Sequence, residues 1–126
     1  FHGILKGTHL TFCYKNADIL VSTMDTEGGI GRVVLEGMYF GVVPIAVDRT
    51  ASREFIIDGI NGFLYKANDA ANLADLILRL YRDRGLISKT RKSAMAIRQK
   101  ANFERNIGEQ YFELVNQIFS DRVMQI

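Results

Sequence analysis

Short apolar runs alternate with polar and glycine-rich stretches along the first half of the chain. Residues 18–22 (DILVS) and 42–47 (VVPIAV) are short and almost wholly apolar, which is typical of strands buried on both faces of a parallel sheet. We expect two further strands, one within residues 1–5 (FHGIL) and one at the end of residues 53–65 (REFIIDGINGFLY).

Apolar residues between these runs recur at helical spacing. One helix is expected within residues 7–17, with Thr8 as its N-cap. Another is expected from about Ile30 to Gly41, because glycine readily adopts the left-handed conformation that ends a helix. Its buried face is expected to consist of Ile30, Val33, Val34, Gly37 and Met38.

The second half of the chain predicts helices. Asp69 is the expected N-cap of the first, and further helices are expected over residues 86–100 and 103–121. The apolar stripe of the first consists of Leu73, Leu76, Ile77 and Leu80. The chain therefore divides into an α/β part, residues 1–68, and a helical part, residues 69–126.

This order of elements predicts an α/β fold, a Rossmann-like parallel sheet with flanking helices on both faces. About four short strands are expected, and no GxGxxG motif follows the first of them. The pattern is typical of the second half of a doubly wound domain. Half a sheet would leave one strand edge exposed, so we expect a missing N-terminal part before Phe1.

Composition excludes several classes of protein. Apolar residues make up 48% of the 126 residues, too many for a disordered chain, and no run approaches the roughly 18 apolar residues of a membrane span. The single Cys13 excludes an internal disulfide and indicates a reducing, cytoplasmic setting. His2 and His9 have no partners at ligand spacing, so we expect no metal site.

Charge is spread unevenly along the chain. Residues 1–78 hold 6 Lys and Arg against 9 Asp and Glu, whereas residues 79–126 hold 10 against 5. Such a basic part can contact phosphates or an anionic membrane surface. The alternation of the basic residues with acidic and apolar ones is more typical of a solvated helix face.

A polar, glycine-rich loop follows the strand at residues 18–22. In open α/β sheets, ligands bind beyond the carboxyl ends of the strands, where this loop lies. Gly28, Gly29 and Gly31 allow backbone N–H groups to approach a ligand, and the following helix adds the partial positive charge of its N-terminus. The combination favours a diphosphate, or a sugar hydroxyl with a phosphate beside it.

Two carboxylates accompany these glycines. Glu36 either forms a surface ion pair with Arg32 at i−4 or accepts hydrogen bonds from a ribose diol, since a carboxylate has two acceptor oxygens. Glu27 either faces the helix N-terminus or holds a sugar hydroxyl and stabilises positive charge at an anomeric carbon. The residues alone leave both alternatives open.

A long ordered pattern carries a family resemblance. The stretch ADILVSTMDTEGGIGRVVLEGMYFGVVPIAV, followed by REFIIDGINGFLY and LADLILRLYRD, resembles the C-terminal donor-binding domain of retaining GT-B glycosyltransferases, the "group 1" family. The resemblance covers about Phe1 to Asp83. It implies that the chain is part of a nucleotide-sugar-binding domain and of an enzyme that transfers a hexose to a saccharide or lipid-linked acceptor with retention. It further implies that the enzyme needs no metal or other cofactor and binds no nucleic acid. The implied location is cytoplasmic. If the basic part of the chain binds the membrane, the protein would be peripheral at its inner face.

The resemblance also implies site residues. The family's ribose-binding glutamate falls on Glu36, its catalytic glutamate falls near Glu27, and its loop glycines fall close to Gly28, Gly29 and Gly31. The expected donor-binding residues are Gly3, Gly28, Gly29, Ile30, Gly31, Arg32 and Glu36. Possible loop contacts are Thr50, Ala51 and Glu54.

The chain departs from the family pattern at two places. Eight residues separate Glu27 from Glu36 where the family has seven, so Glu27 reaches the expected position only if one loop residue bulges out. The family's Gly-Gly pair is Thr50-Ala51 here, which indicates a different choice of donor. In the family, the Arg and Lys that clamp the pyrophosphate belong to the part expected before Phe1.

Two other functions stay open. A nucleotide-binding or assembly module that has lost turnover would explain Thr50-Ala51 and the shifted Glu27. A GT-B epimerase would share the ribose-binding glutamate, and sugar transfer to an acceptor would separate it from a transferase. The chain alone is expected to be inactive, because the family's acceptor domain lies upstream.

Overall fold

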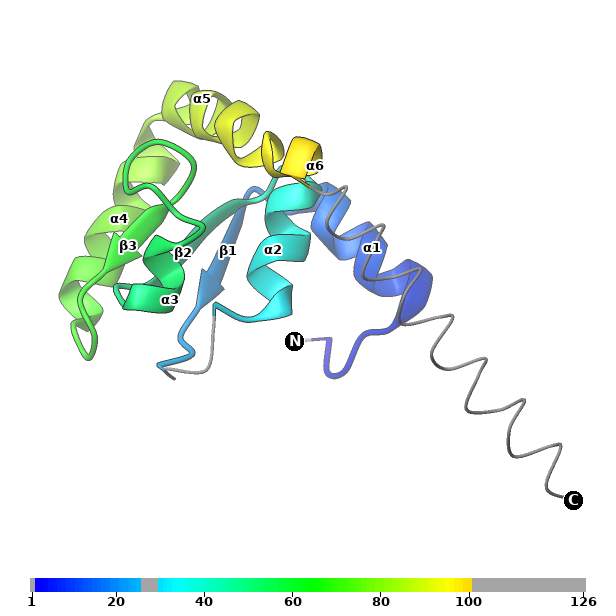
Figure 1. The fold of residues 1–126 in the computed structure, drawn as a ribbon, viewed down its shortest axis with the longest axis horizontal. Coiled ribbons are helices and arrows are strands. Elements are labelled where there is room, and N and C mark those ends of the chain that lie inside the picture. Colours follow the sequence, from blue (N-terminus) through cyan, green and yellow to red (C-terminus); the bar gives the residue numbers. More distant parts are fainter. Residues whose placement is uncertain (1, 26–29, 101–126) are drawn as a thin grey trace, which may run out of the picture.

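The computed structural model describes residues 2–25 and 30–100 of the chain. In this part of the chain, three parallel strands form one sheet, in the spatial order β1, β2, β3 (Figure 1). The strands are β1 (Ile19–Ser22), β2 (Val43–Val47) and β3 (Phe63–Tyr65). Within the described residues, β1 pairs with β2 alone, and Val21 on this edge strand is 40% exposed.

Six helices are found among the described residues, and they cover both faces of the sheet (Figure 1). They are α1 (Gly7–Asn16), α2 (Arg32–Tyr39), α3 (Thr50–Arg53), α4 (Ala70–Arg82), α5 (Arg84–Met95) and α6 (Ile97–Lys100). In that part of the chain, no helix is long and apolar enough to cross a membrane.

Strand β2 carries the core on both of its faces. All five of its residues are buried, and alternate side chains point to opposite sides, as the period of a strand requires. The cluster on the α4 side consists of Val43, Ile45, Val47, Phe63, Tyr65, Leu80 and Ile87. The cluster on the α2 side consists of Ile30, Val34, Met38, Ala46, Ile56 and Ala94. The parallel α/β fold is thereby confirmed.

Local signals predicted several boundaries correctly. Gly41 has a φ of 80° just beyond α2, which confirms it as the residue that ends this helix. The Asp69 side chain accepts a hydrogen bond of 2.9 Å from the Asn72 backbone N–H, which confirms it as the N-cap of α4. Both features depend on residues that are close together in sequence.

Other boundaries were wrong. Residues 2–5 form no strand, because Gly3 adopts a left-handed φ of 65° where a strand needs extended backbone. Thr8 is not an N-cap, since α1 begins at Gly7 with Lys6 in the capping position. The helix expected over residues 86–100 is interrupted at Ala96, between α5 and α6.

Two apolar positions also differ from the expectation. Val33 is 54% exposed and Ile77 is 36% exposed, so neither belongs to the buried face of its helix. Ile30 is buried as expected, but α2 begins two residues later, at Arg32. The helix expected over residues 103–121 lies outside the described residues.

Asp18 ties α5 to the amino ends of the first two strands. Its carboxylate accepts hydrogen bonds from Arg84 at 3.0 Å and Arg91 at 2.8 Å, and Arg91 also donates to the Gly41 carbonyl at 2.8 Å. Its backbone carbonyl accepts from the Val43 N–H at 3.0 Å. Two of the basic residues in the second half of the chain therefore have a structural partner.

Asp18→Asn is expected to lower stability in a pH-dependent way. The hydrogen bonds from Arg84 and then Arg91 lower the pKa of Asp18, so the stabilisation is present above the unfolded pKa near 4 and is lost as pH falls. Because the carboxylate is partly exposed, we expect a cost of about 1 kcal/mol or less at pH 7. Urea unfolding at pH 7 and pH 3 measures it.

Asp75→Asn, an exposed aspartate on α4, is the matched control and should leave stability nearly unchanged. The gap between wild type and Asp18→Asn should be smaller at pH 3 than at pH 7, because below pH 4 the unfolded state takes up a proton at Asp18 more readily than the folded state does. An equal gap at both pH values would contradict the assignment of Asp18 as a charged anchor.

Candidate functional site

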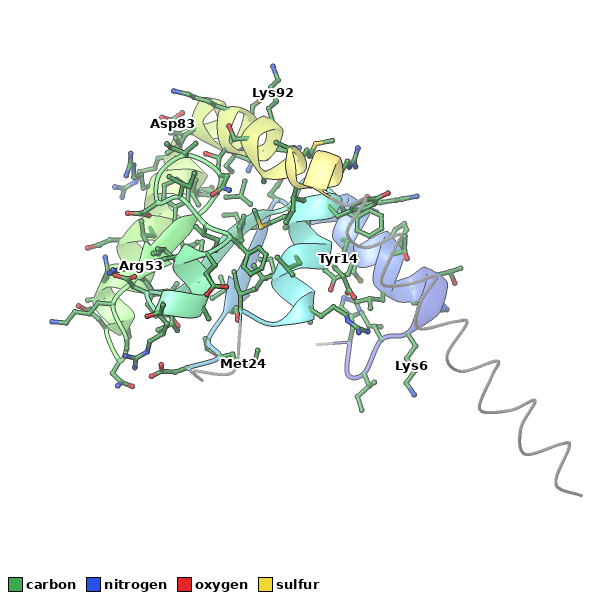
Figure 2. The ribbon with its side chains drawn as sticks, in the orientation of Figure 1. Lys6, Tyr14, Met24, Arg53, Asp83 and Lys92 are labelled. Atoms are coloured by element: carbon green, nitrogen blue, oxygen red, sulfur yellow. The ribbon has the colours of Figure 1, made fainter. Side chains whose placement is uncertain are left out.

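The carboxyl edge of the sheet brings three separate segments together. Residues 23–25 follow β1, α3 follows β2, and the start of α4 follows β3, and parallel strands all end at the same edge. A hydrogen bond of 2.8 Å from the Asp48 N–H to the Tyr65 carbonyl joins the carboxyl ends of β2 and β3, from which two of these segments continue. Figure 2 shows Met24 and Arg53 on this edge.

Among the residues that the structure describes, two arginine–aspartate pairs lie at this edge. Arg49 donates to both carboxylate oxygens of Asp25, at 2.5 and 2.9 Å, and Arg53 donates to both oxygens of Asp48, at 2.6 and 2.9 Å. These bidentate bonds, together with the guanidinium charge, lower the pKa of both aspartates. Both aspartates therefore stay ionised near neutral pH, which keeps the edge polar but electrically balanced.

An open hollow of about 460 Å³ lies over the second pair, and its lining is mostly polar. It is lined by Asp48, Arg49, Thr50, Ala51 and Arg53. Two of the three possible loop contacts, Thr50 and Ala51, are thus brought to the hollow. Glu54 is exposed at the end of α3 and does not line it. Paired guanidinium and carboxylate groups present both donors and acceptors, which is what sugar hydroxyls require.

The N-terminus of α2 depends on the left-handed backbone of Gly31. This glycine occupies the N-cap position with a φ of 84°, and a Cβ there would lie 2.5 Å from the terminal carbon of Met24. The backbone conformation therefore favours glycine, whereas the terminal methyl of the flexible Met24 side chain could move aside. Ile30 is only 6% exposed and packs in the core, so its backbone alone is left for a ligand, whereas Arg32 is exposed.

The remaining expected residues are placed less directly. Gly3 is exposed, and open space surrounds the position of a Cβ there. Glu27, Gly28 and Gly29 lie outside the described residues, so their roles stay predictions. Within residues 2–25 and 30–100, no group of three His, Cys, Asp or Glu side chains is arranged to hold a metal ion.

Glu36 has a partner that the sequence did not indicate. Its Oε2 accepts a hydrogen bond of 2.9 Å from the hydroxyl of Tyr14, which comes 22 residues earlier in the chain. In the described part of the chain, Glu36 forms no ion pair with Arg32. The surface ion pair considered from the sequence is therefore not found, and the carboxylate is half-buried between α1 and α2 instead.

Tyr14 is held firmly at this contact. Its side chain is 6% exposed and points between α1 and α2 (Figure 2), where its ring stacks on Phe40 with centroids 5.6 Å apart and an interplanar angle of 8°. Burial, followed by the hydrogen bond and the charge of Glu36, raises the pKa of Tyr14 to about 12. The phenol therefore stays protonated and remains a donor at neutral pH.

Comparison with known proteins identifies relatives of this chain. The family described as "Glycosyl transferases group 1" matches residues 1–101. EpsD of Bacillus subtilis (strain 168), which is named as a glycosyltransferase, is 39% identical over 108 residues. That match covers 82% of this chain and 28% of EpsD.

Solved structures share the fold. The C-terminal domain of LpcC from Francisella tularensis, a glycosyl transferase group 1 family protein, is 26% identical with a TM-score of 0.70, over 79% of this chain and 51% of that domain. HepE of Anabaena in complex with UDP is 22% identical with a TM-score of 0.71, over 85% of this chain and 30% of HepE. The chain thus spans about half or less of these proteins.

Tyr14→Phe is expected to flatten the loss of stability at alkaline pH. Because the folded-state pKa of about 12 lies above the usual 10.0, the stabilisation is complete below pH 10 and is lost as pH rises towards 12. Wild type should therefore lose about 1 kcal/mol more than Tyr14→Phe between pH 9 and pH 11, as measured by urea unfolding.

Tyr39→Phe is the matched control, because Tyr39 lies on α2 beside Phe40 but is 38% exposed. It should keep the wild-type alkaline profile. If Tyr14→Phe and Tyr39→Phe gave the same profile, the raised pKa of the buried, hydrogen-bonded Tyr14 would be refuted.

Proposed function

Because the chain belongs to the glycosyl transferases of group 1, we propose that it is the donor-binding part of a retaining glycosyltransferase. The complete enzyme would transfer a hexose from a nucleoside diphosphate sugar to a saccharide or a lipid-linked acceptor. The observation that carries the proposal is the half-buried carboxylate of Glu36 on the helix that starts at the carboxyl edge of the sheet.

Glu36 is the proposed ribose-binding residue. A carboxylate offers about four acceptor positions, and the bond from Tyr14 occupies one of them. The remaining positions are enough for the two hydroxyls of a ribose diol. A bond from a hydroxyl to a charged acceptor is also stronger than one between neutral groups, which suits a residue that anchors a ligand.

The proposed position of the donor sugar is the hollow at α3. Its lining offers donors from the Arg53 pair, acceptors from Asp48 and the hydroxyl of Thr50. Ligands of parallel α/β sheets bind at this edge, beyond the strand ends. Thr50 and Ala51, which replace the family's Gly-Gly pair, line this hollow. We therefore expect the choice of donor sugar to be altered here.

Known complexes of relatives support a nucleotide sugar as the donor. HepE, which shares the fold, has been solved with UDP and with UDP-glucose. We extend this class of ligand to the present chain as part of the proposal. The proposal has three further parts. Glu27 is the catalytic residue, and the backbone amides of Gly28 and Gly29 bind the phosphates. The transfer takes place without a metal ion.

The proposal is tested by Glu36→Ala in a calorimetric titration of the full-length protein with UDP, GDP and ADP. One diphosphate should bind wild type best, and the substitution should weaken it by about tenfold to a hundredfold, since hydrogen bonds to a charged group are lost. Asp75→Ala, on α4 at the other face of the sheet, is the control and should bind as wild type does.

Two results would contradict the proposal. One is that none of the three diphosphates binds the full-length protein. The other is that Glu36→Ala binds as tightly as Asp75→Ala. Binding that depends on Glu36 but leads to no sugar transfer to any acceptor would instead favour a nucleotide-binding module.

A further inference from the structure

Three side chains form one contact between α1 and α2. Glu36 and Phe40 are four residues apart, so they lie next to each other on the same face of α2 and its C-terminal extension. Tyr14 contacts both of them, with its ring stacked on Phe40 and its hydroxyl bonded to Glu36. Tyr14, Glu36 and Phe40 therefore form a single cluster of side chains.

The ring stack fixes where the hydroxyl lies. Tyr14 is almost fully buried, and its ring is nearly parallel to that of Phe40, which itself packs edge-on against Tyr39. The last turn of α2 is also fixed, because the Phe40 N–H donates a hydrogen bond of 3.1 Å to the Glu36 carbonyl. A phenol held in this way can donate in few directions, and it donates to Oε2 of Glu36.

The hydroxyl in turn restricts the carboxylate. A free glutamate side chain has three rotatable bonds and loses conformational entropy when a ligand orders it. A carboxylate that is already bonded has lost part of that freedom before the ligand arrives, so less is lost on binding. In the described residues, the second oxygen of Glu36 accepts no hydrogen bond.

We propose that Tyr14 is a positioning residue, which holds the Glu36 carboxylate in the orientation that accepts hydrogen bonds from the vicinal diol of a nucleotide ribose. This inference rests on the proposed function of Glu36. It assigns to α1 a role in ligand recognition, although Tyr14 itself does not have to touch the ligand. A purely structural tyrosine would stabilise the contact between α1 and α2 without affecting how the site distinguishes ribose hydroxyls.

The test compares a nucleoside diphosphate with its 2′,3′-dideoxy form. The ligand is whichever of UDP, GDP and ADP binds the full-length wild-type protein most tightly, and calorimetry gives both affinities. The ratio of the two affinities reports the diol contact alone, because base and phosphates are the same. We expect a ratio of about tenfold to a hundredfold in wild type and a ratio near one in Glu36→Ala.

Tyr14→Phe keeps the stacked ring and removes only the hydroxyl. We expect it to reduce the ratio by about threefold to tenfold, while its affinity for the dideoxy ligand stays within about twofold of wild type. Tyr39→Phe makes the same chemical change one residue from Phe40 and should keep the wild-type ratio. Phe40→Leu keeps both polar groups but removes the stacking partner, so it should reduce the ratio even if Tyr14→Phe does not fold.

The outcomes separate this inference from the proposed function. If Glu36→Ala loses the ratio but Tyr14→Phe and Phe40→Leu keep it, Glu36 binds ribose and Tyr14 has no positioning role. If Tyr14→Phe weakens both ligands equally, its role is structural and the inference fails. If Glu36→Ala keeps the ratio, or none of the diphosphates binds, the proposed function fails and the inference fails with it.

Discussion

The burial of strand β2 on both faces determines the rest of this structure. Every residue of the strand is buried, and it pairs with β1 on one side and β3 on the other. Each fully buried Val or Ile contributes about 1.5 to 3 kcal/mol, and the alternation of side chains directs these contributions towards α4 and α2 in turn. The strands are thereby aligned, and their carboxyl ends open onto one edge.

This alignment positions the polar groups of the candidate site. The ion pairs of Asp25 with Arg49 and of Asp48 with Arg53 use residues that follow two neighbouring strands. Glu36 depends on the same core, because α2 packs through Val34 and Met38 against the sheet. The core thus fixes the backbone of α2, while Tyr14 and its stack on Phe40 restrict the side chain of Glu36.

The sequence predicted what depends on neighbouring residues. The buried strands, the end of α2 at Gly41 and the cap at Asp69 follow from local patterns of hydrophobicity and turn chemistry. It did not indicate the bond between Tyr14 and Glu36, since 22 residues separate them and only the packing of α1 on α2 brings them together. The apolar residues at 1–5 suggested a strand, but the left-handed backbone of Gly3 prevents one. The spacing of apolar residues predicts which face of a helix or strand is buried. It does not predict which distant residues form hydrogen bonds with its polar side chains.

A crystal structure of the full-length protein with its preferred nucleoside diphosphate tests the central claim most directly. We predict that the two ribose hydroxyls lie within about 3 Å of the Glu36 carboxylate, with the Tyr14 hydroxyl still bonded to Oε2. The diphosphate should lie at the N-terminus of α2, and the hollow lined by Thr50 and Arg53 should face the position of the sugar. A nucleotide bound away from Glu36 would contradict the account.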